Sequence, residues 1–261
     1  MSFSSATAIS GGPGTWTATL EEGWDIFGVT NGGYLMSIAT RAMEAETDGR
    51  ELISATASFM NPATPGPVEV AVEALKRGRT LSTLRATLSR QDRDLVYVTG
   101  VYADPGRPIN DATLTRGAPP SMPAPEDCIA TEPASDAPIP PPFTGKVELR
   151  VPSEDVAVFG TAAEARSRGW FRLRDGEGLN AHAVVLATDS FPPAIFFSNL
   201  AVGWTPTVDM TIQIRNPAPV GWLACQYTTR YVSGGMLEED GEIWDEDGLV
   251  AISRQLALVP R

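Results

Sequence analysis

The chain has few residues that carry nucleophilic or metal-based chemistry. It contains one histidine and two cysteines among 261 residues. A single histidine excludes zinc sites built from several histidines, and any Ser-His-Asp or Cys-His arrangement would have to use His182. No G-x-S-x-G motif occurs. Cys128 and Cys225 lack metal-ligand spacing and are interpreted as structural. Chemistry in this chain must therefore depend on carboxylates, amides, hydroxyls or the backbone, with no metal and no cofactor expected.

His182 itself lies in the segment LNAHAVVLATDSF, which is mostly apolar and has the character of a helix. A lone histidine in such a segment is usually a hydrogen-bonded packing residue. We therefore interpret His182 as structural.

Long apolar runs and excess positive charge are also missing. No window approaches 18 continuous apolar residues, and the start MSFSSATAISGG has neither a charged nor an apolar leader region. We expect no membrane span and no signal peptide, and hence a cytoplasmic protein. The 20 Lys and Arg against 32 Asp and Glu give a net charge of −12. This charge repels nucleic acids and anionic membranes, so neither is expected as a partner.

Proline is unevenly distributed. Eleven of the 22 prolines lie between Pro105 and Pro142, which is typical of a linker. The predicted organisation is an N-terminal domain over 1–104, a proline-rich linker over 105–142 and a C-terminal domain over 143–261. Each flanking part has the size of a small domain.

The two parts repeat the same order of elements, a helix followed by strands. Apolar spacing predicts one helix after Asn31-Gly32-Gly33, over 34–46, and another over 179–189. Asn61-Pro62-Ala63 recurs 155 residues later as Asn216-Pro217-Ala218, which supports an internal duplication of α+β class. The expected strands are 15–20, 51–60, 68–78, 81–90 and 95–103, then 194–200, 207–215, 222–232, 236–245 and 249–259.

Three stretches carry a family resemblance: GWDIFGVTNGGYLMSIATRAM, SFMNPATPGPVEVAVEALKRGRTLSTLRATLSRQ and SGGMLEEDGEIWDEDGLVAISRQLALVPR. Together they resemble the double-hotdog acyl-CoA thioesterases of the thioesterase II type, over both halves but not the linker. The resemblance implies two antiparallel sheets, each wrapped around a long helix. It also implies hydrolysis of acyl-CoA thioesters without metal, cofactor or covalent intermediate, and it leaves a homo-oligomer open.

The family's catalytic group is an Asp, a Thr and a Gln that hold a water. The resemblance places the Asp on Asp209 and the Gln on Gln255. It places Arg230 at the Thr position, with Thr228 as the nearby hydroxyl candidate. Period-2 alternation puts all four on the more polar faces of their strands. A solvated sheet face is the structural alternative for each of them.

The repeat adds an independent argument. The positions of the first half that correspond to Asp209 and Gln255 hold Ser54 and Val101, so only the second half has kept a polar pair. One site per chain follows. The oxyanion donors are expected at Asn31, Gly32 and Gly33, because free backbone N–H groups converge at a helix N-terminus. Close helix packing is the alternative reason for these glycines.

Two other functions remain open. A non-catalytic acyl-CoA or acyl-carrier binding module would explain Arg230 as the mark of a decayed site. A hydratase of the same fold would need a catalytic His paired with Asp, for which His182 is poorly placed.

The acidic run over 238–247 is interpreted as an exposed hairpin. The sequence fixes neither the acyl chain length nor the choice between coenzyme A and a carrier protein.

Overall fold

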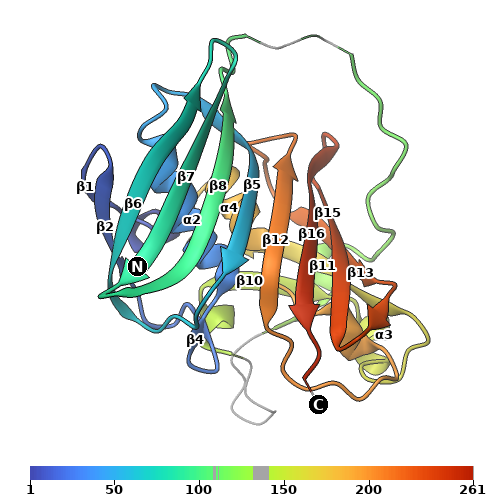
Figure 1. Cartoon of the computed structure of the whole chain (residues 1–261). Coiled ribbons are helices and arrows are strands. Elements are labelled where there is room, and N and C mark those ends of the chain that lie inside the picture. The colour runs from blue at the N-terminus through green and yellow to red at the C-terminus, as the bar shows by residue number, and fades with distance from the viewer. Residues whose placement is uncertain (108–109, 111, 132–140, 261) are drawn as a thin grey trace.

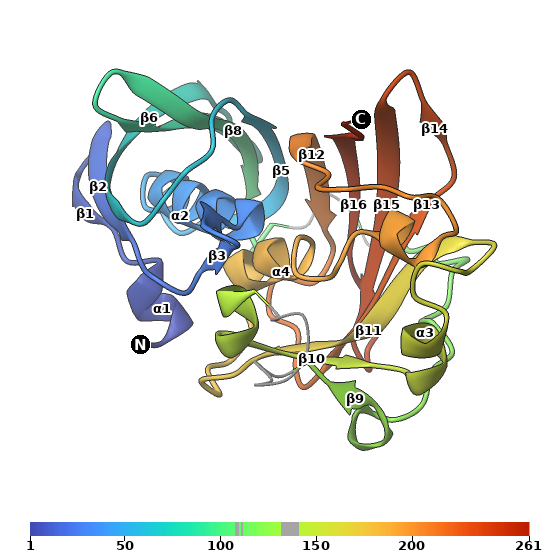
Figure 2. The same ribbon diagram turned by 90° about the horizontal axis from the view of Figure 1, so that it is seen from below.

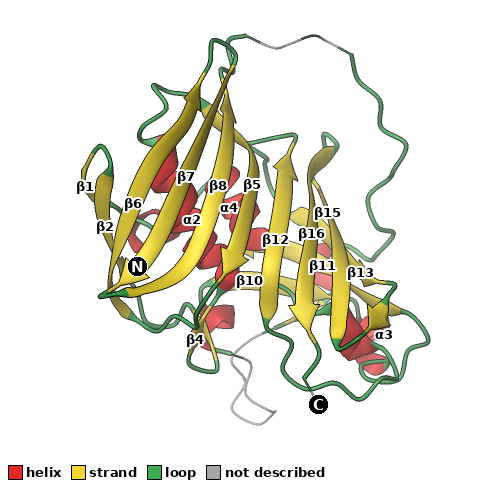
Figure 3. Ribbon diagram, in the orientation of Figure 1, coloured by secondary structure: helices red, strands yellow, loops and turns green. Residues whose placement is uncertain are grey.

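The computed structural model describes residues 1–107, 110, 112–131 and 141–260. In this part of the chain the strands form one continuous 14-stranded sheet and a small two-stranded one (Figures 1 and 3). The strand order of the large sheet is β1-β2-β6-β7-β8-β5-β12-β16-β15-β13-β11-β10-β9, with β14 paired to β15. Figure 2 shows the sheet curling around helix α2 in one half and around helix α4 in the other.

The first half contains one long helix and six strands of the large sheet, of which β6, β7 and β8 form a meander. The alternating burial of its strands reflects an apolar inner face and a polar outer face. Its elements are α1 Phe3–Ala6, β1 Ser10–Gly12, β2 Thr15–Leu20, β3 Asp25–Ile26, β4 Val29–Thr30, α2 Gly32–Glu44, β5 Glu51–Phe59, β6 Gly66–Arg77, β7 Leu81–Arg90 and β8 Arg93–Ala103.

The second half repeats the helix and meander with a shorter helix. Its elements are η1 Pro125–Asp127, β9 Ile129–Ala130, η2 Pro142–Gly145, β10 Val147–Val151, α3 Ser153–Ala157, β11 Ala165–Leu173, α4 Ala181–Ala187, η3 Ala194–Phe197, β12 Thr207–Ile214, β13 Leu223–Thr229, β14 Val232–Ser233, β15 Met236–Trp244 and β16 Leu249–Leu258. The strand predicted over 194–200 is wrong, since this segment begins as a 3-10 helix with Pro193 at its N-cap. Part of the expected linker forms the edge strand β9.

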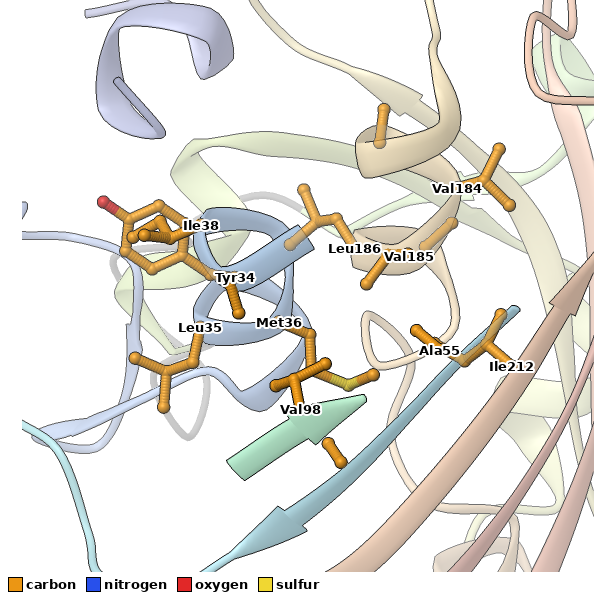
Figure 4. Packing of buried hydrophobic residues seen from close by; sticks show 14 of the residues in the cluster. Tyr34, Leu35, Met36, Ile38, Ala55, Val98, Val184, Val185, Leu186 and Ile212 are labelled. Atoms are coloured by element: carbon orange, nitrogen blue, oxygen red, sulfur yellow. The ribbon is translucent and has the colours of Figure 1, made fainter. Parts of the chain in front are cut away.

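Helix α2 begins at Gly32, two residues before the predicted start. Asn31 is the N-cap residue, and its Oδ1 accepts a hydrogen bond from the backbone N–H of Tyr34 at 2.9 Å. Helix α4 has the same kind of cap in Asn180. The apolar side chains of both helices fill the space between them and the sheet (Figure 4), and Met36 and Ile38 are fully buried.

The two halves meet where β5 pairs with β12. Thr56 and Thr211 lie directly opposite each other, with their hydroxyl oxygens 3.0 Å apart. These two threonines are 155 residues apart, which is the offset of the sequence repeat. The pseudo-twofold axis therefore passes between them. The expectation of two separate sheets around two long helices differs from this arrangement, because the β5–β12 ladder fuses the sheets and α4 has only 7 residues.

Over the ranges given above, no helix combines the length and the apolar character that a bilayer crossing requires.

Candidate active site

A cavity of about 660 Å³ lies between the two halves. This volume falls within the range of small-molecule sites. Its wall is mostly apolar and comes from both halves. Polar groups enter it from the start of α2, the end of α4 and the ends of β12, β15 and β16. The apolar lining includes Ile26, Leu35, Phe59, Phe143, Phe191, Phe196, Trp204 and Tyr227.

Asp189 is one of two carboxyl groups that line this cavity. It lies just beyond α4, next to the N-terminus of α2, where the side-chain amide of Asn31 and the backbone N–H of Gly33 both donate to its Oδ2, at 3.0 and 2.9 Å. Burial raises the pKa of Asp189 to about 6, although hydrogen bonds from Gly33, Gly32 and Asn31 oppose the rise. The two bonds with these distances both end on Oδ2, and Asp189 lines the cavity.

The glycines at the start of α2 permit this contact. A Cβ on Gly33 would stand 3.0 Å from the Cβ of Asp189 and 3.1 Å from the carbonyl oxygen of Leu186. A Cβ on Gly32 would stand 2.9 Å from the ring of Phe59. The close packing at the start of α2 and the approach of Asp189 to the helix N-terminus therefore both depend on Gly32 and Gly33. The partial positive charge of this helix end favours an anion, and Asp189 supplies one.

Gln255 and Thr207 bring an amide and a hydroxyl to the same cavity. Gln255 lies on the inner face of β16 and is 7% exposed. The hydroxyl of Thr207 donates to Oε1 of Gln255 at 3.3 Å. A register shift between Thr207 and Asp209 places Thr207 opposite Ala257, a buried residue on the face of Gln255. This bulge turns Thr207 inward, although strict alternation would place it on the face of Asp209.

A second carboxyl, Glu239, also lines the cavity. It lies on β15 directly opposite Gln255, whose Nε2 donates to its Oε1 at 3.2 Å. Its Oε2 accepts from the backbone N–H of Ala194. Burial raises the pKa of Glu239 to about 8, and the charges of Asp189 and Glu238 add to the rise. The prediction that the acidic run forms an exposed hairpin is wrong at this residue, which is 7% exposed.

The structure does not bring Asp209 to Gln255. In the β12–β16 ladder, Met210 is opposite Gln255 while Asp209 is opposite Leu256. Directly opposite residues share a face, so Asp209 and Gln255 lie on opposite faces of the sheet. Asp209 contacts the hydroxyl of Ser58 at 3.4 Å on the outer face and does not line the cavity. The prediction that Asp209 and Gln255 stand side by side is therefore wrong.

Thr228 and Arg230 also lie on the outer face of the sheet. Together they line a polar groove distinct from the cavity. Arg230 is exposed and pairs with Asp240, which also binds Arg254. Neither residue approaches Gln255. The solvated-face alternative holds for both, and the hydroxyl that binds Gln255 in the cavity is that of Thr207.

Asn31 and Gly32 line the cavity, but their donors are engaged: the backbone N–H of Asn31 binds the carbonyl oxygen of Trp24, and the Asn31 amide and the Gly32 backbone bind Asp189. The N–H of Gly33 does not remain free, because it binds Asp189.

His182 is buried between the helices, with Nε2 2.9 Å from Glu44 and Nδ1 3.0 Å from Thr40. Over the residues that the structure describes, no three His, Cys, Asp or Glu side chains are arranged to hold a metal ion.

Near one rim of the cavity lies the side chain of Arg93, on a turn that also carries Asp92 and Asp94. Asn61 lines the cavity and accepts a hydrogen bond from Arg93 at 2.6 Å. Arg93 is exposed. Arg90, at the other side of the same turn, binds the backbone at Gly66, where β6 begins. The basic residues at the far end of β6, including Arg77, lie away from this rim.

Comparison with known proteins decides the family. Residues 20–103 match the model of the acyl-CoA thioesterase N-terminal domain, and residues 125–259 match that of the C-terminal domain. The chain belongs to the acyl-CoA thioesterase family. A solved structure from Thermobifida fusca, described as a candidate thioesterase II, is 32% identical to this thioesterase-family chain. It has a TM-score of 0.86, and the match covers 99% of this chain and 97% of the other.

More distant relatives extend the comparison. A conserved hotdog-fold protein from Alicyclobacillus acidocaldarius has a TM-score of 0.88 at 20% identity, over 99% of this chain and 98% of its own. At this identity the likeness shows the fold alone. Among curated proteins, the thioesterase-like protein TwmA of Talaromyces wortmannii is 24% identical over 94% of this acyl-CoA thioesterase family member and 88% of its own length.

Sequence reasoning identified Gln255 as a candidate but missed Asp189, Thr207 and Glu239. Asp189 follows a helix and belongs to no strand pattern, so only the packing of α4 against α2 reveals it. Thr207 is hidden by the bulge. The one signal for Glu239 was alternation, since it shares a strand face with two apolar residues, Leu237 and Ile243.

Proposed function

We propose that this protein hydrolyses acyl-CoA thioesters, using a water that Asp189, Gln255 and Thr207 hold in the cavity. The observation that carries the proposal is Asp189: a buried carboxylate with a pKa of about 6, fixed at a helix N-terminus, in the wall of an apolar cavity. A general base works best when its pKa lies near the working pH. The proposal moves the carboxylate role from Asp209 to Asp189 and keeps Gln255.

The three side chains have complementary roles. The carboxylate of Asp189 accepts a proton from the water as the water attacks. Gln255 and Thr207 are hydrogen-bonded to each other at 3.3 Å, which restricts their rotation and leaves each with capacity to bind the water. Holding the water in this way converts the attack into an intramolecular step.

The start of α2 supports the reacting carbonyl. As the oxygen of water bonds to the thioester carbon, negative charge develops on the carbonyl oxygen. The partial positive charge of the α2 N-terminus, whose donors already bind Asp189 and Trp24, stabilises that charge through space. The C–S bond then breaks, and the proton held by Asp189 passes to the departing sulfur. The products are the free acid and coenzyme A as its thiol.

The remaining surfaces fit the two ends of the substrate. The apolar part of the cavity accepts the acyl chain, because burying each CH₂ contributes about 0.8 kcal/mol. The phosphates of coenzyme A are assigned to the rim at Arg93, which carries positive charge in a chain of net charge −12.

The test is to incubate the protein with acyl-CoA esters from two carbons to long chain and to follow the released thiol. We expect release from at least one chain-length class, and incorporation of one oxygen from labelled water into the acid. Stoichiometric binding of an acyl-CoA with no thiol released from any member would refute hydrolysis and favour a binding module.

Two variants separate the proposed roles. Thr207→Val and Gln255→Leu remove hydrogen bonds to the water while keeping the approximate shape of the side chains. Each is expected to lower kcat on the order of 100-fold, the effect of a misplaced reacting group. Thr228→Val, on the outer face, is the matched control and should leave kcat unchanged. Loss of activity in the control alone would contradict the assignment.

A further inference from the structure

Glu239 is a buried carboxyl of the cavity that the proposed hydrolysis does not use. It lies on the inner face of β15 with Leu237 and Ile243, while Glu238, Asp240 and Glu242 point to the outer face. An unpaired carboxyl in an apolar wall is costly to bury. Its contacts therefore indicate what it does there.

Those contacts fix the amide of Gln255 from both ends. Nε2 of Gln255 donates to Glu239 at 3.2 Å, and Oε1 of Gln255 accepts from Thr207 at 3.3 Å. An ionised carboxylate only accepts hydrogen bonds, so it must face the NH₂ end of the amide. A neutral carboxylic acid also donates, so it tolerates the amide in either orientation.

The charged groups around Glu239 help to raise its pKa. Asp189 faces it from the end of α4, and Tyr227 faces it from β13. The arginines of this region, Arg230 and Arg254, pair with Asp240 on the outer face. Glu239 therefore has neutral hydrogen-bond donors beside it and like charges near it. Its pKa of about 8 reflects burial first and these charges second.

We propose that Glu239 is a positioning residue whose ionisation locks the Gln255 amide with its carbonyl toward Thr207 and the attacking water. This rests on the proposed hydrolysis for its effect on rate, but the orientation of the amide is a property of the free protein. When Glu239 is neutral, the amide turns over in part of the molecules, and Oε1 no longer faces the water.

The kinetic test is the pH dependence of kcat/KM between pH 7 and 9. With a pKa of about 8, the ionised fraction rises from about one tenth to about nine tenths over this range. Wild-type kcat/KM should therefore rise by up to about ninefold. Glu239→Gln should abolish this rise. Glu242→Gln removes the same charge from the outer face of the same strand and should keep it.

The spectroscopic test does not need activity. The side-chain amide signals of ¹⁵N-labelled Gln255, assigned by their loss in Gln255→Leu, should shift with pH around 8 in the wild type and stay constant in Glu239→Gln. An amide signal that does not titrate, or a kinetic rise that persists in Glu239→Gln, would overturn the proposal.

The two proposals fail in different ways. An amide that titrates in a protein that hydrolyses no thioester supports the contact and refutes the hydrolysis. An amide that titrates in an active enzyme with flat kcat/KM overturns the positioning role. If Glu239→Gln does not fold, the Gln255 amide signals of the wild type and of Glu242→Gln still test the proposal. A shift near pH 8 in both proteins supports the contact between Glu239 and Gln255. A signal that does not shift in the wild type overturns the proposal.

Discussion

The pH dependence of turnover below pH 7 follows from the environment of Asp189. Its ordinary pKa of 3.8 is raised to about 6 by burial. A base must be ionised to accept a proton, so activity should fall as pH decreases through this pKa. The ionised fraction is about nine tenths at pH 7 and about one tenth at pH 5, so kcat/KM should decrease about ninefold between them.

The assay is thiol release at subsaturating acyl-CoA from pH 4.5 to 7, with wild-type protein and Asp209→Asn. Both should show the same midpoint near pH 6, because Asp209 lies on the other face of the sheet. An exposed aspartate would remain mostly ionised at pH 5, so it would give almost no decrease. A midpoint near pH 4 in a folded protein would refute the reasoning.

The same pKa predicts an effect on stability of the opposite sign to that on activity. Because the folded state raises the pKa, wild-type stability decreases as pH rises from about 3.8 to about 6 and stays lower above that. Asp189→Asn should remove this loss. At pH 7 the variant should be more stable to urea by up to about 3 kcal/mol, from a shift of roughly two pKa units. A destabilised variant at pH 7 would contradict the burial argument.

Further predictions concern packing and the rim. Gly33→Ala should destabilise the fold by about 1–3 kcal/mol in urea titration, because its Cβ would overlap neighbours at 3.0–3.1 Å. Gly145→Ala, with no heavy atom within 4 Å of its Cβ, should leave stability nearly unchanged, and an equal effect in both variants would refute the packing argument. Arg93→Ala should raise KM for acyl-CoA several-fold with kcat unchanged, whereas Arg77→Ala should not. An unchanged KM in Arg93→Ala would remove that rim from the substrate site.

Much of the fold could be predicted because it depends on local periodicity. Helix α2 and the strands β5 to β8 match the predicted segments to within a few residues. The repeat offset of 155 residues reappears in the pairing of Thr56 with Thr211. By contrast, the apolar segment after Pro193 has strand-like composition but forms a 3-10 helix, because local composition alone does not distinguish the two.

The site was harder to predict, because tertiary packing assembles it. Alternation places a residue on a face only while the register holds, and the bulge before Asp209 breaks it at Thr207. The contact between Asp189 and Gly33 joins positions 156 residues apart. Gln255 was identified through family resemblance, and its inner-face position came from the structure. No local pattern places a carboxylate from one helix end at the start of another.

The most direct measurement compares kcat/KM of Asp189→Asn with that of Asp209→Asn on one acyl-CoA substrate. The two substitutions are chemically identical and differ in place: Asp189 lies in the cavity wall after α4, and Asp209 lies on the outer face of β12. Removing the general base should lower kcat/KM by about 10²- to 10⁴-fold in Asp189→Asn, while Asp209→Asn should retain wild-type activity. A folded Asp189→Asn with wild-type turnover, or an inactive Asp209→Asn, would contradict the assignment of the active site to the cavity.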